Sequence, residues 1–186
     1  MAKTVLVPLA DGFEELEAIT IIDLLRRAGF EVATAGLHDG PIQASRGTRH
    51  LADITIDEAV NRDFDLVALP GGLPGADHLR DDPRVQQILR RQNEKGGEIA
   101  AICAAPKALI AAGVTEGHQI TGYPGALDDS PGDYDYTGSP VQVDGNIVTS
   151  RGPGTAMDFA LTLIETLGGK ALRDQVEAEL VREPVS

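Results

Sequence analysis

The chain has 186 residues, of which 42% are hydrophobic and 4% aromatic, and it carries a net charge of −13. This composition lies within the range of globular proteins and excludes fibrous classes. A chain of this length can form a core without disulfide or metal staples, so we expect a single domain over residues 1–186. No apolar run approaches the ~18 residues of a membrane-spanning helix, and residues 1–4 lead directly into a strand pattern, so we expect a cytoplasmic protein without a signal peptide.

The negative charge bears on partners and on habitat. A surface of this sign repels phosphate backbones and anionic lipids, so we expect neither nucleic acid nor membranes as partners. The chain has 17 Asp and 12 Glu against 12 Arg and only 4 Lys. This balance fits a protein solvated in a salty cytosol, and it fits equally a GC-biased genome that replaces Lys with Arg.

The chain begins with a strand, a turn and a helix. Residues 3–9 form a near-continuous apolar run, the pattern of a strand that is buried on both faces in a parallel sheet. A helix is predicted over residues 14–28, where acids occupy the first turn and basic residues the last, before Gly29. Its apolar residues recur at helical spacing: Leu16, Ile19, Ile22 and Leu25.

The same alternation continues to the end of the chain. Strands are predicted over residues 30–36, 64–70, 98–102 and 119–121, with shorter β structure up to residue 56 and a hairpin around residues 144–145. Helices are predicted over residues 83–95, 105–112, 155–167 and 171–181. Buried strands that alternate with helices indicate an α/β fold, with a doubly wound, mostly parallel sheet flanked by helices.

In such a fold, ligands bind beyond the carboxyl ends of the strands, and Cys103 lies directly after the strand at residues 98–102. It is the sole cysteine, which excludes an intramolecular disulfide and a cysteine-rich zinc site. The small residues Ala101 and Ala105, two positions away on either side, are typical of a nucleophile elbow. Because N–H groups at a helix N-terminus stabilise a thiolate, we expect a lowered thiol pKa. A buried, inert cysteine is the alternative interpretation.

Two further features lie at the same edge of the predicted sheet. Gly71 and Gly72 follow the strand at residues 64–70, and their uncovered N–H groups can form an anion-binding nest or an ordinary turn. Glu17 interrupts the apolar face of the first helix, so burial would raise its pKa and keep a proton for donation to a thiolate or its oxides. A structural carboxyl group is the alternative there. For Glu14 and Glu15, the helix dipole is a sufficient explanation.

Other classical sites are not indicated. The histidines His38, His50, His78 and His118 are scattered without metal-ligand spacing, so we expect no metal, and a Cys–His site would need the fold to bring one of them close. Residues 150–157 resemble a dinucleotide fingerprint superficially. Met157 occupies the third small position, however, and no strand follows to complete a βαβ unit, so we expect no cofactor.

Four segments of the chain resemble the ThiJ/PfpI superfamily, in its DJ-1 and YajL-like branch: residues 11–17, 69–72, 100–106 and 149–155. The resemblance implies a flavodoxin-like homodimer. It also implies that Cys103 is the reactive elbow cysteine, that Glu17 is the protonated glutamate beside it, and that Gly72 and Ala104 are backbone donors around the site. Gly71 lies in the second of these segments and is expected to line the site.

The resemblance assigns two further positions. Arg46 resembles the family arginine at the dimer interface, from which it can reach the partner's site. Tyr123 stands before Pro124 where DJ-1-like relatives carry a histidine, whereas YajL-like members carry an aromatic residue there.

Two functions remain open, and both use Cys103 and Glu17. As a glyoxalase- or deglycase-type enzyme, the protein would add its thiolate to reactive aldehydes such as methylglyoxal, or to glycated groups, while Glu17 relays the proton. As a redox sensor or chaperone in oxidative stress, it would carry Cys103 as sulfinate and bind unfolded client proteins. Peptidase or amidase chemistry is least favoured, because Tyr123 leaves no imidazole to shuttle protons.

Overall fold

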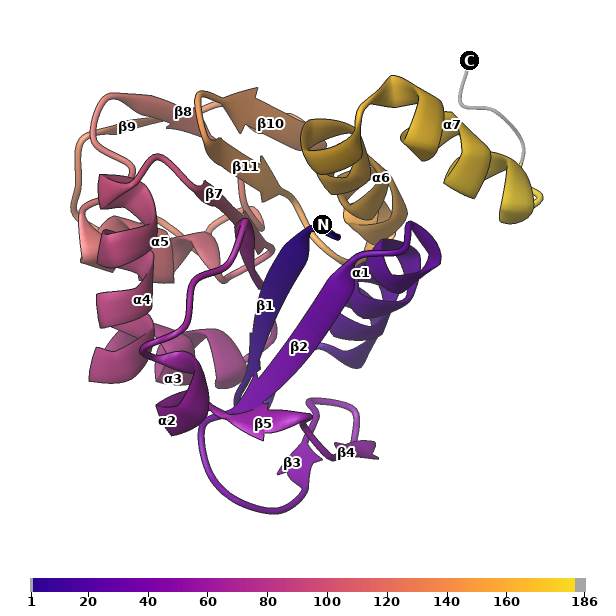
Figure 1. Ribbon diagram of the computed structural model, residues 1–186. Coiled ribbons are helices and arrows are strands. Elements are labelled where there is room, and N and C mark those ends of the chain that lie inside the picture. The colour runs from indigo at the N-terminus through magenta and orange to yellow at the C-terminus, as the bar shows by residue number, and fades with distance from the viewer. Residues whose placement is uncertain (1, 183–186) are drawn as a thin grey trace.

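Seven strands form one central sheet in the computed structural model, which describes residues 2–182 (Figure 1). All neighbouring strands of this sheet are parallel except the first pair, β10 and β11. In spatial order they are β10 (Val141–Asp144), β11 (Ile147–Ser150), β7 (Glu98–Ile102), β6 (Leu66–Leu69), β1 (Thr4–Leu9), β2 (Glu31–Gly36) and β5 (Ile54–Thr55). The predicted doubly wound, mostly parallel α/β fold is therefore confirmed. The predicted domain also includes Met1 and residues 183–186, which lie outside the described residues.

Two small two-stranded sheets accompany the main one. An antiparallel pair consists of β3 (Ile42–Gln43) and β4 (Arg49–His50), within the interval where short β structure is predicted. A parallel pair consists of β8 (His118–Ile120) and β9 (Tyr134–Tyr136).

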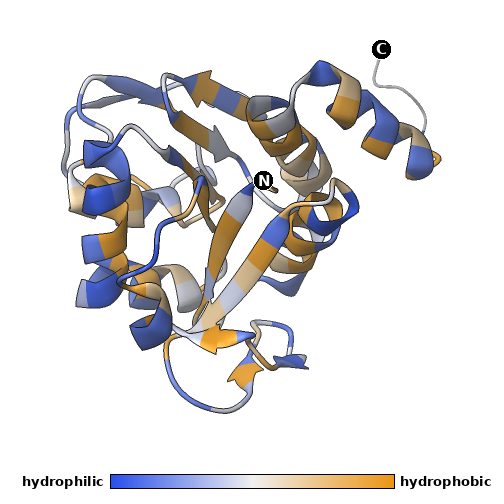
Figure 2. Cartoon of the chain, in the orientation of Figure 1, coloured by the Kyte–Doolittle hydropathy of each residue, from blue (hydrophilic) through white to orange (hydrophobic). Residues whose placement is uncertain are grey.

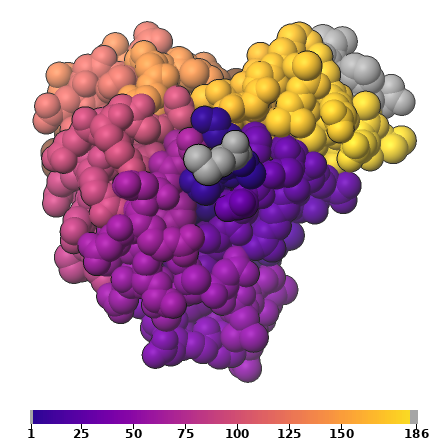
Figure 3. Space-filling view, viewed as in Figure 1, coloured from indigo at the N-terminus to yellow at the C-terminus, as the bar shows by residue number. Residues whose placement is uncertain are grey.

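Helices cover both faces of the main sheet (Figure 1). On one face α1 (Glu15–Arg27) and α6 (Ala156–Gly168) pack against the strands, and α7 (Lys170–Glu179) packs on α6 and projects from the molecule in Figure 3. The other face carries four helices: α2 (Ile56–Ala59), α3 (Gly75–Asp81), α4 (Pro83–Glu94) and α5 (Pro106–Ala112).

The core consists of two hydrophobic clusters, one on each face of the sheet. Successive side chains of β1 alternate between them, with Val5 and Val7 in the cluster under α1 and α6 and Leu6 in the cluster under α4 and α5. This alternation is the normal geometry of a strand, and here both faces are covered. Hydrophobic colour accordingly follows the central strands in Figure 2, while hydrophilic colour gathers on the outer sides of the helices.

The buried face of α1 matches the predicted one only in part, because Ile22 and Leu25 are buried as expected but Leu16 and Ile19 are not. Leu16 and Ile19 are 53% and 41% exposed, whereas Glu17 is fully buried. Beside the predicted Leu25, the helix also turns Ile21 and Ala18 toward the sheet, and all three are fully buried. The predicted stripe through Leu16 and Ile19 is thus wrong, and Glu17 lies on the face that contacts the core.

Helices α2 and α3 and strand β9 are not in the set of predicted elements. Helix α3 begins at Gly75 directly after Pro74, and its seven residues have weak intrinsic helix propensity. It is held by tertiary packing, because Ala76 and Leu79 are fully buried. Strand β9 has β8 as its partner, so its hydrogen bonds are decided by a segment more than ten residues away.

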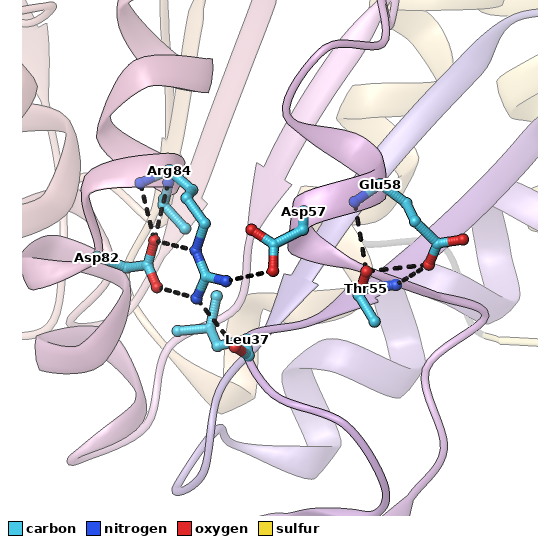
Figure 4. Close-up of polar contacts among 7 residues, drawn as sticks. Leu37, Thr55, Asp57, Glu58, Asp82 and Arg84 are labelled. Carbon is cyan, nitrogen blue, oxygen red and sulfur yellow. Dashed lines mark hydrogen bonds and ion pairs between the residues drawn. The ribbon is translucent and has the colours of Figure 1, made fainter.

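Polar contacts tie the helices of the second face together (Figure 4). Asp82 caps α4 by accepting hydrogen bonds from the N–H groups of Arg84 and Val85. The Arg84 guanidinium donates to Asp82, to Asp57 of α2 at 2.9 Å and to the carbonyl of Leu37 at 2.9 Å. This network joins the start of α4 to α2 and to the end of β2. It supports the loops at the carboxyl edge of the sheet.

Residues 2–182 contain neither a membrane-spanning helix nor a metal-binding cluster. The helices there are all too short or too polar to span a lipid bilayer. Within the same residues, His, Cys, Asp and Glu nowhere gather in a group of three or more that could hold a metal ion.

Candidate active site

Cys103 occupies a strained turn at the carboxyl end of β7. Its φ of 64° lies in the left-handed region, which is uncommon for a residue with a side chain and is typical of nucleophile elbows. The turn is fixed by backbone hydrogen bonds on both sides. The Cys103 N–H donates to the carbonyl of Ser150 at 2.9 Å, and its carbonyl accepts from the N–H of Tyr123 at 2.8 Å. The predicted elbow geometry is therefore present.

Glu17 comes from α1, 86 positions earlier in the chain, and lies beside this elbow. Its side chain is fully buried, and its Oε2 accepts a 2.8 Å hydrogen bond from the Gly71 N–H. Its Oε1 has no partner of standard hydrogen-bond geometry within residues 2–182. The carboxyl and the Cys103 thiol nevertheless lie close enough to shift each other's pKa. Oε1 is thus the oxygen available to the sulfur.

Gly71 and Gly72 bring the backbone close to both groups. A Cβ on Gly71 would lie 2.6 Å from the Cys103 Cβ and 2.7 Å from Glu17 Oε2. Gly72 has a φ of 92°, and a Cβ there would lie 2.4 Å from the backbone nitrogen of Glu14. Both positions therefore exclude larger residues for steric reasons, which the sequence pattern alone does not show.

Glu17 and Cys103 form a titrating pair. Burial raises the pKa of Glu17 to about 7, against the lowering effect of hydrogen bonds with Gly71 and Cys103. Burial and then the negative charge of Glu17 raise the pKa of Cys103 to about 12, although the N–H groups of Gly72 and Ala104 lower it. Two ionisable groups this strongly coupled lose their protons in steps that belong to the pair.

The expectation of a lowered Cys103 pKa is therefore wrong beside an ionised Glu17. Helix α5 begins only at Pro106, three residues after Cys103, and has seven residues, so its dipole at the sulfur is weak. Burial outweighs it. The predicted raised pKa of Glu17 is, in contrast, what the structure shows.

Cys103 opens into a cavity of about 390 Å³. Among the predicted site residues, Gly72, Ala104 and Tyr123 line the cavity with it, whereas Glu17 and Gly71 do not. Arg46 also lines it, from the turn after β3, with its side chain 78% exposed and its Nε 3.8 Å from Glu14 Oε2. Arg46 thus reaches the cavity of its own chain, and its contact with a second chain stays a prediction.

The cavity also contains residues that the sequence interpretation missed. Glu14 lines it and accepts a 3.0 Å hydrogen bond from the Ser45 hydroxyl, while Glu15 accepts from the Arg46 N–H at 3.0 Å. These two acids hold the turn that carries Arg46 over the cavity, so they do more than complement the helix dipole. The sequence signal that could have identified Glu14 and Glu15 as site residues is their place in residues 11–17, one of the four segments that resemble the family. Pro153 also lines the cavity.

The histidines take no part in this lining. Those residues of the described chain that line the cavity include no imidazole. His38 pairs with Asp11 at 3.0 Å, and His50 stacks edge-on against Phe13 with ring centroids 5.4 Å apart. The arrangement can therefore supply a thiol, a proton-holding carboxyl and backbone N–H donors.

Comparisons with known proteins agree with this architecture. Residues 3–166 match the model of the DJ-1/PfpI family. The chain is 45% identical over 183 residues to the Parkinson disease protein 7 homolog of Danio rerio, covering 96% of this chain and 97% of that one. It is 36% identical over 165 residues to the glutathione-independent glyoxalase DJR-1.2 of Caenorhabditis elegans, covering 89% and 88%.

Solved structures show the same fold. The crystal structure of Drosophila melanogaster DJ-1beta has a TM-score of 0.95 and 42% identity, covering 99% of this chain and all of that one (100%). The structure of oxidized Toxoplasma gondii DJ-1 has a TM-score of 0.90 and 39% identity, covering 98% and 100%. With the family match over most of its length, the chain belongs to the DJ-1/PfpI family.

Proposed function

We propose that this protein is a cysteine-dependent enzyme of the glyoxalase or deglycase type, which acts on reactive carbonyl compounds without a cofactor. The observation that carries the proposal is the pairing of Cys103, which lines the cavity, with the fully buried, proton-holding carboxyl group of Glu17. The relative in Caenorhabditis elegans, named as a glutathione-independent glyoxalase, supports the same reaction class.

The proposed reaction requires the pair to supply a thiolate near neutral pH. When one proton has left the pair, the remaining one can stay on Glu17 while the negative charge resides on sulfur. The N–H groups of Gly72 and Ala104 favour this form, since their hydrogen bonds lower the Cys103 pKa. Glu17 in its neutral form no longer repels the thiolate.

In the proposed reaction, the Cys103 thiolate adds to the aldehyde carbon of methylglyoxal, and Glu17 gives its proton to the oxygen that becomes a hydroxyl group. The Glu17 carboxylate then removes the hydrogen of that carbon as a proton and returns it to the neighbouring carbon through an enediol. The first carbon is thereby oxidised to a thioester and the second is reduced to an alcohol. Water cleaves the thioester, releasing lactate and restoring the thiol. In this proposal the N–H groups of Gly72 and Ala104, which hydrogen-bond to Cys103, also donate to the developing oxyanion.

Lactate formation from methylglyoxal tests this proposal. We expect the unmodified protein to form lactate without glutathione, and Cys103→Ala to form none. A glycated peptide assayed in parallel separates the deglycase from the glyoxalase form of the reaction. Equal lactate formation by the unmodified protein and Cys103→Ala would overturn the proposal.

A second candidate function uses the same cysteine as an oxidation sensor. The solved structure of a Toxoplasma gondii relative is described as oxidized, and the donors around Cys103 can hold the oxygens of a sulfinate. The chain contains no second cysteine, so a sulfenate cannot close an intramolecular disulfide. In this function the protein binds unfolded clients, and suppression of client aggregation that survives Cys103→Ala would indicate a chaperone surface instead.

Peptidase or amidase chemistry remains the least favoured of the three. Tyr123 occupies the position at which DJ-1-like relatives have a histidine, so no imidazole stands there to shuttle protons for acyl transfer.

A homodimer is the proposed assembly. Leu16 and Ile19 expose apolar surface on adjacent turns of α1, and Arg46 is exposed beside the cavity. Light scattering tests this, with a dimeric mass expected and a monomeric mass contradicting it.

A further inference from the structure

We propose that Arg151 and the cavity beside it form a subsite for an anionic group on the substrate, so that the preferred substrate is an α-oxo aldehyde carrying a carboxylate or phosphate. This inference rests on the proposed carbonyl chemistry at Cys103 and specifies its substrate class. It gives a role to the segment at residues 150–155, which the reaction itself does not use.

A second cavity adjoins that of Cys103. It has a volume of about 490 Å³ and is lined by residues 123–124 and 151–155. Tyr123 and Pro153 line both cavities, so the two meet at these residues. A three-carbon aldehyde bound to Cys103 needs only the first cavity, whereas a longer substrate can extend past Tyr123 into the second.

The charge of the second cavity is positive. Arg151 is the sole charged residue among those that line it, and within residues 2–182 no carboxylate lies within 4.0 Å of the Arg151 guanidinium. Arg46, at the first cavity, instead has Glu14 at 3.8 Å. In a chain with 29 acidic residues, an arginine in a cavity wall without an acidic partner is suited to an anion from solution.

The position of Arg151 relative to the nucleophile is fixed by the backbone. The carbonyl of Ser150, the preceding residue, accepts the hydrogen bond from the Cys103 N–H at 2.9 Å, and the Arg151 N–H donates to the Pro140 carbonyl at 3.2 Å. The Ser150 hydroxyl is held by Thr155 at 2.6 Å and also donates to Pro140. The backbone of Arg151 is therefore held next to Ser150, the residue that hydrogen-bonds to Cys103, in a segment fixed by several hydrogen bonds.

The chemistry of the guanidinium defines the ligand. Its planar fork donates two parallel hydrogen bonds to a carboxylate or to a phosphate, and binds neither neutral hydroxyls nor apolar groups as strongly. Both anions share this chemistry, so the substrate carries one of them a few bonds from its reacting carbonyl. The reaction at Cys103 stays the same, because the anion contacts Arg151 and not the reacting atoms.

Steady-state kinetics with three aldehydes test the inference: methylglyoxal, 4,5-dioxopentanoate with its carboxylate, and hydroxypyruvaldehyde phosphate. The measured quantity is kcat/KM for each anionic aldehyde divided by kcat/KM for methylglyoxal. We expect this ratio to fall by about tenfold or more in Arg151→Ala, as for loss of a charge-assisted hydrogen bond, and less in Arg151→Lys. The two anionic substrates distinguish a carboxylate subsite from a phosphate subsite.

Arg90→Ala is the matched control. Arg90 is an exposed arginine on α4, and none of the described acids pairs with it within 4.0 Å, so it shares the charge of Arg151 but lies outside the two cavities. We expect its ratio to equal that of the unmodified protein. An unchanged ratio in Arg151→Ala, or an equal fall in Arg90→Ala, would overturn the subsite.

A binding measurement separates this inference from the proposed function. Inorganic phosphate, titrated into the labelled protein, should shift the backbone amide NMR signals of residues 151, 152, 154 and 155, and should not do so in Arg151→Ala. Phosphate shifts without turnover of any aldehyde would support the subsite and refute the proposed enzyme. Turnover of methylglyoxal without phosphate shifts and without a changed ratio would refute the subsite alone.

Discussion

The backbone N–H of Gly71 donates a 2.8 Å hydrogen bond to Oε2 of Glu17, the carboxyl group that lies beside Cys103. Gly71 also fills the space between the two side chains, since a Cβ there would lie within 2.7 Å of both. One glycine thus sets the separation of the acid from the nucleophile, while Oε1 of Glu17 keeps no hydrogen-bond partner within residues 2–182.

Gly71→Ala is expected to impair both stability and activity. The added methyl group overlaps atoms in a buried site, and overpacking of this kind costs about 1–3 kcal/mol. We expect a lower melting temperature and a loss of lactate formation from methylglyoxal that exceeds the loss of folded protein. Gly154→Ala is the control for methylglyoxal turnover, because no atom lies within 4 Å of the added Cβ, the residue has no positive φ, and the second cavity, which Gly154 lines, is not needed for this three-carbon substrate. If Gly71→Ala retains normal turnover, the spacing of the pair does not matter for the chemistry.

Substitutions of Glu17 separate acidity from reach. Glu17→Gln keeps a donor of similar shape without an exchangeable acid proton, and Glu17→Asp keeps the acid but retracts it by one methylene. Both are expected to lose carbonyl turnover by ~100-fold, because general acid–base catalysis is lost or misplaced. Sulfinate needs only a well-placed donor, so Glu17→Gln should still form it while Glu17→Asp stops earlier. Normal turnover and normal oxidation in both variants would leave Glu17 a structural residue.

The raised pKa of Glu17 makes stability depend on pH. The carboxyl binds its proton more tightly in the folded chain, with a pKa of about 7, than in the unfolded chain, where the ordinary value is 4.5. The contribution of Glu17 to the free energy of unfolding is therefore fully present below pH 4.5. It falls as the pH rises toward 7, and it no longer changes above that pH. The pKa shift corresponds to a change in the free energy of unfolding on the order of 3 kcal/mol across this pH range. Melting temperatures measured from pH 4.5 to 8 should show this fall in the unmodified protein and a smaller one in Glu17→Gln.

The pH profile of cysteine alkylation tests the shared proton. If the first ionisation of the pair near pH 7 yields thiolate, the rate of Cys103 alkylation by iodoacetamide should rise through pH 7 and then level off. Glu17→Gln should lose this step, because no carboxyl remains to exchange the proton. A rate in the unmodified protein that increases only above pH 9 would mean that the first charge stays on Glu17.

Mild peroxide is expected to oxidise Cys103 as the dominant site and to stop at sulfinate. The thiol has no resolving cysteine, so a sulfenate can take up a second oxygen. Intact-mass analysis should show a two-oxygen adduct in the unmodified protein and none in Cys103→Ala. An adduct that persists in that variant would place the oxidation on a methionine, such as Met157, which is 38% exposed.

The sequence by itself determined those features that depend on local pattern. The apolar runs identify β1 and β6 because parallel strands covered on both faces need apolar residues at successive positions. Strand β7 ends at Ile102 as predicted, and the small residues Ala101 and Ala105 indicate the elbow at Cys103, since a sharp turn excludes larger neighbours. The sequence also predicts the end of β7 and the start of α1, because Cys103 directly follows an apolar strand pattern and Glu17 lies in the acidic first turn of a helix pattern.

Only the tertiary structure decided how these parts meet. The order of the parallel strands places α1 beside the end of β7, and this brings Glu17 to Cys103 across 86 positions. The same packing buries the thiol against a carboxylate and raises its pKa, where the local helix signal predicted the opposite. The approach of Arg46 and the adjoining cavity of Arg151 also depend on loops from separate strands. Burial and charge act through space, so a pattern along the chain cannot report them.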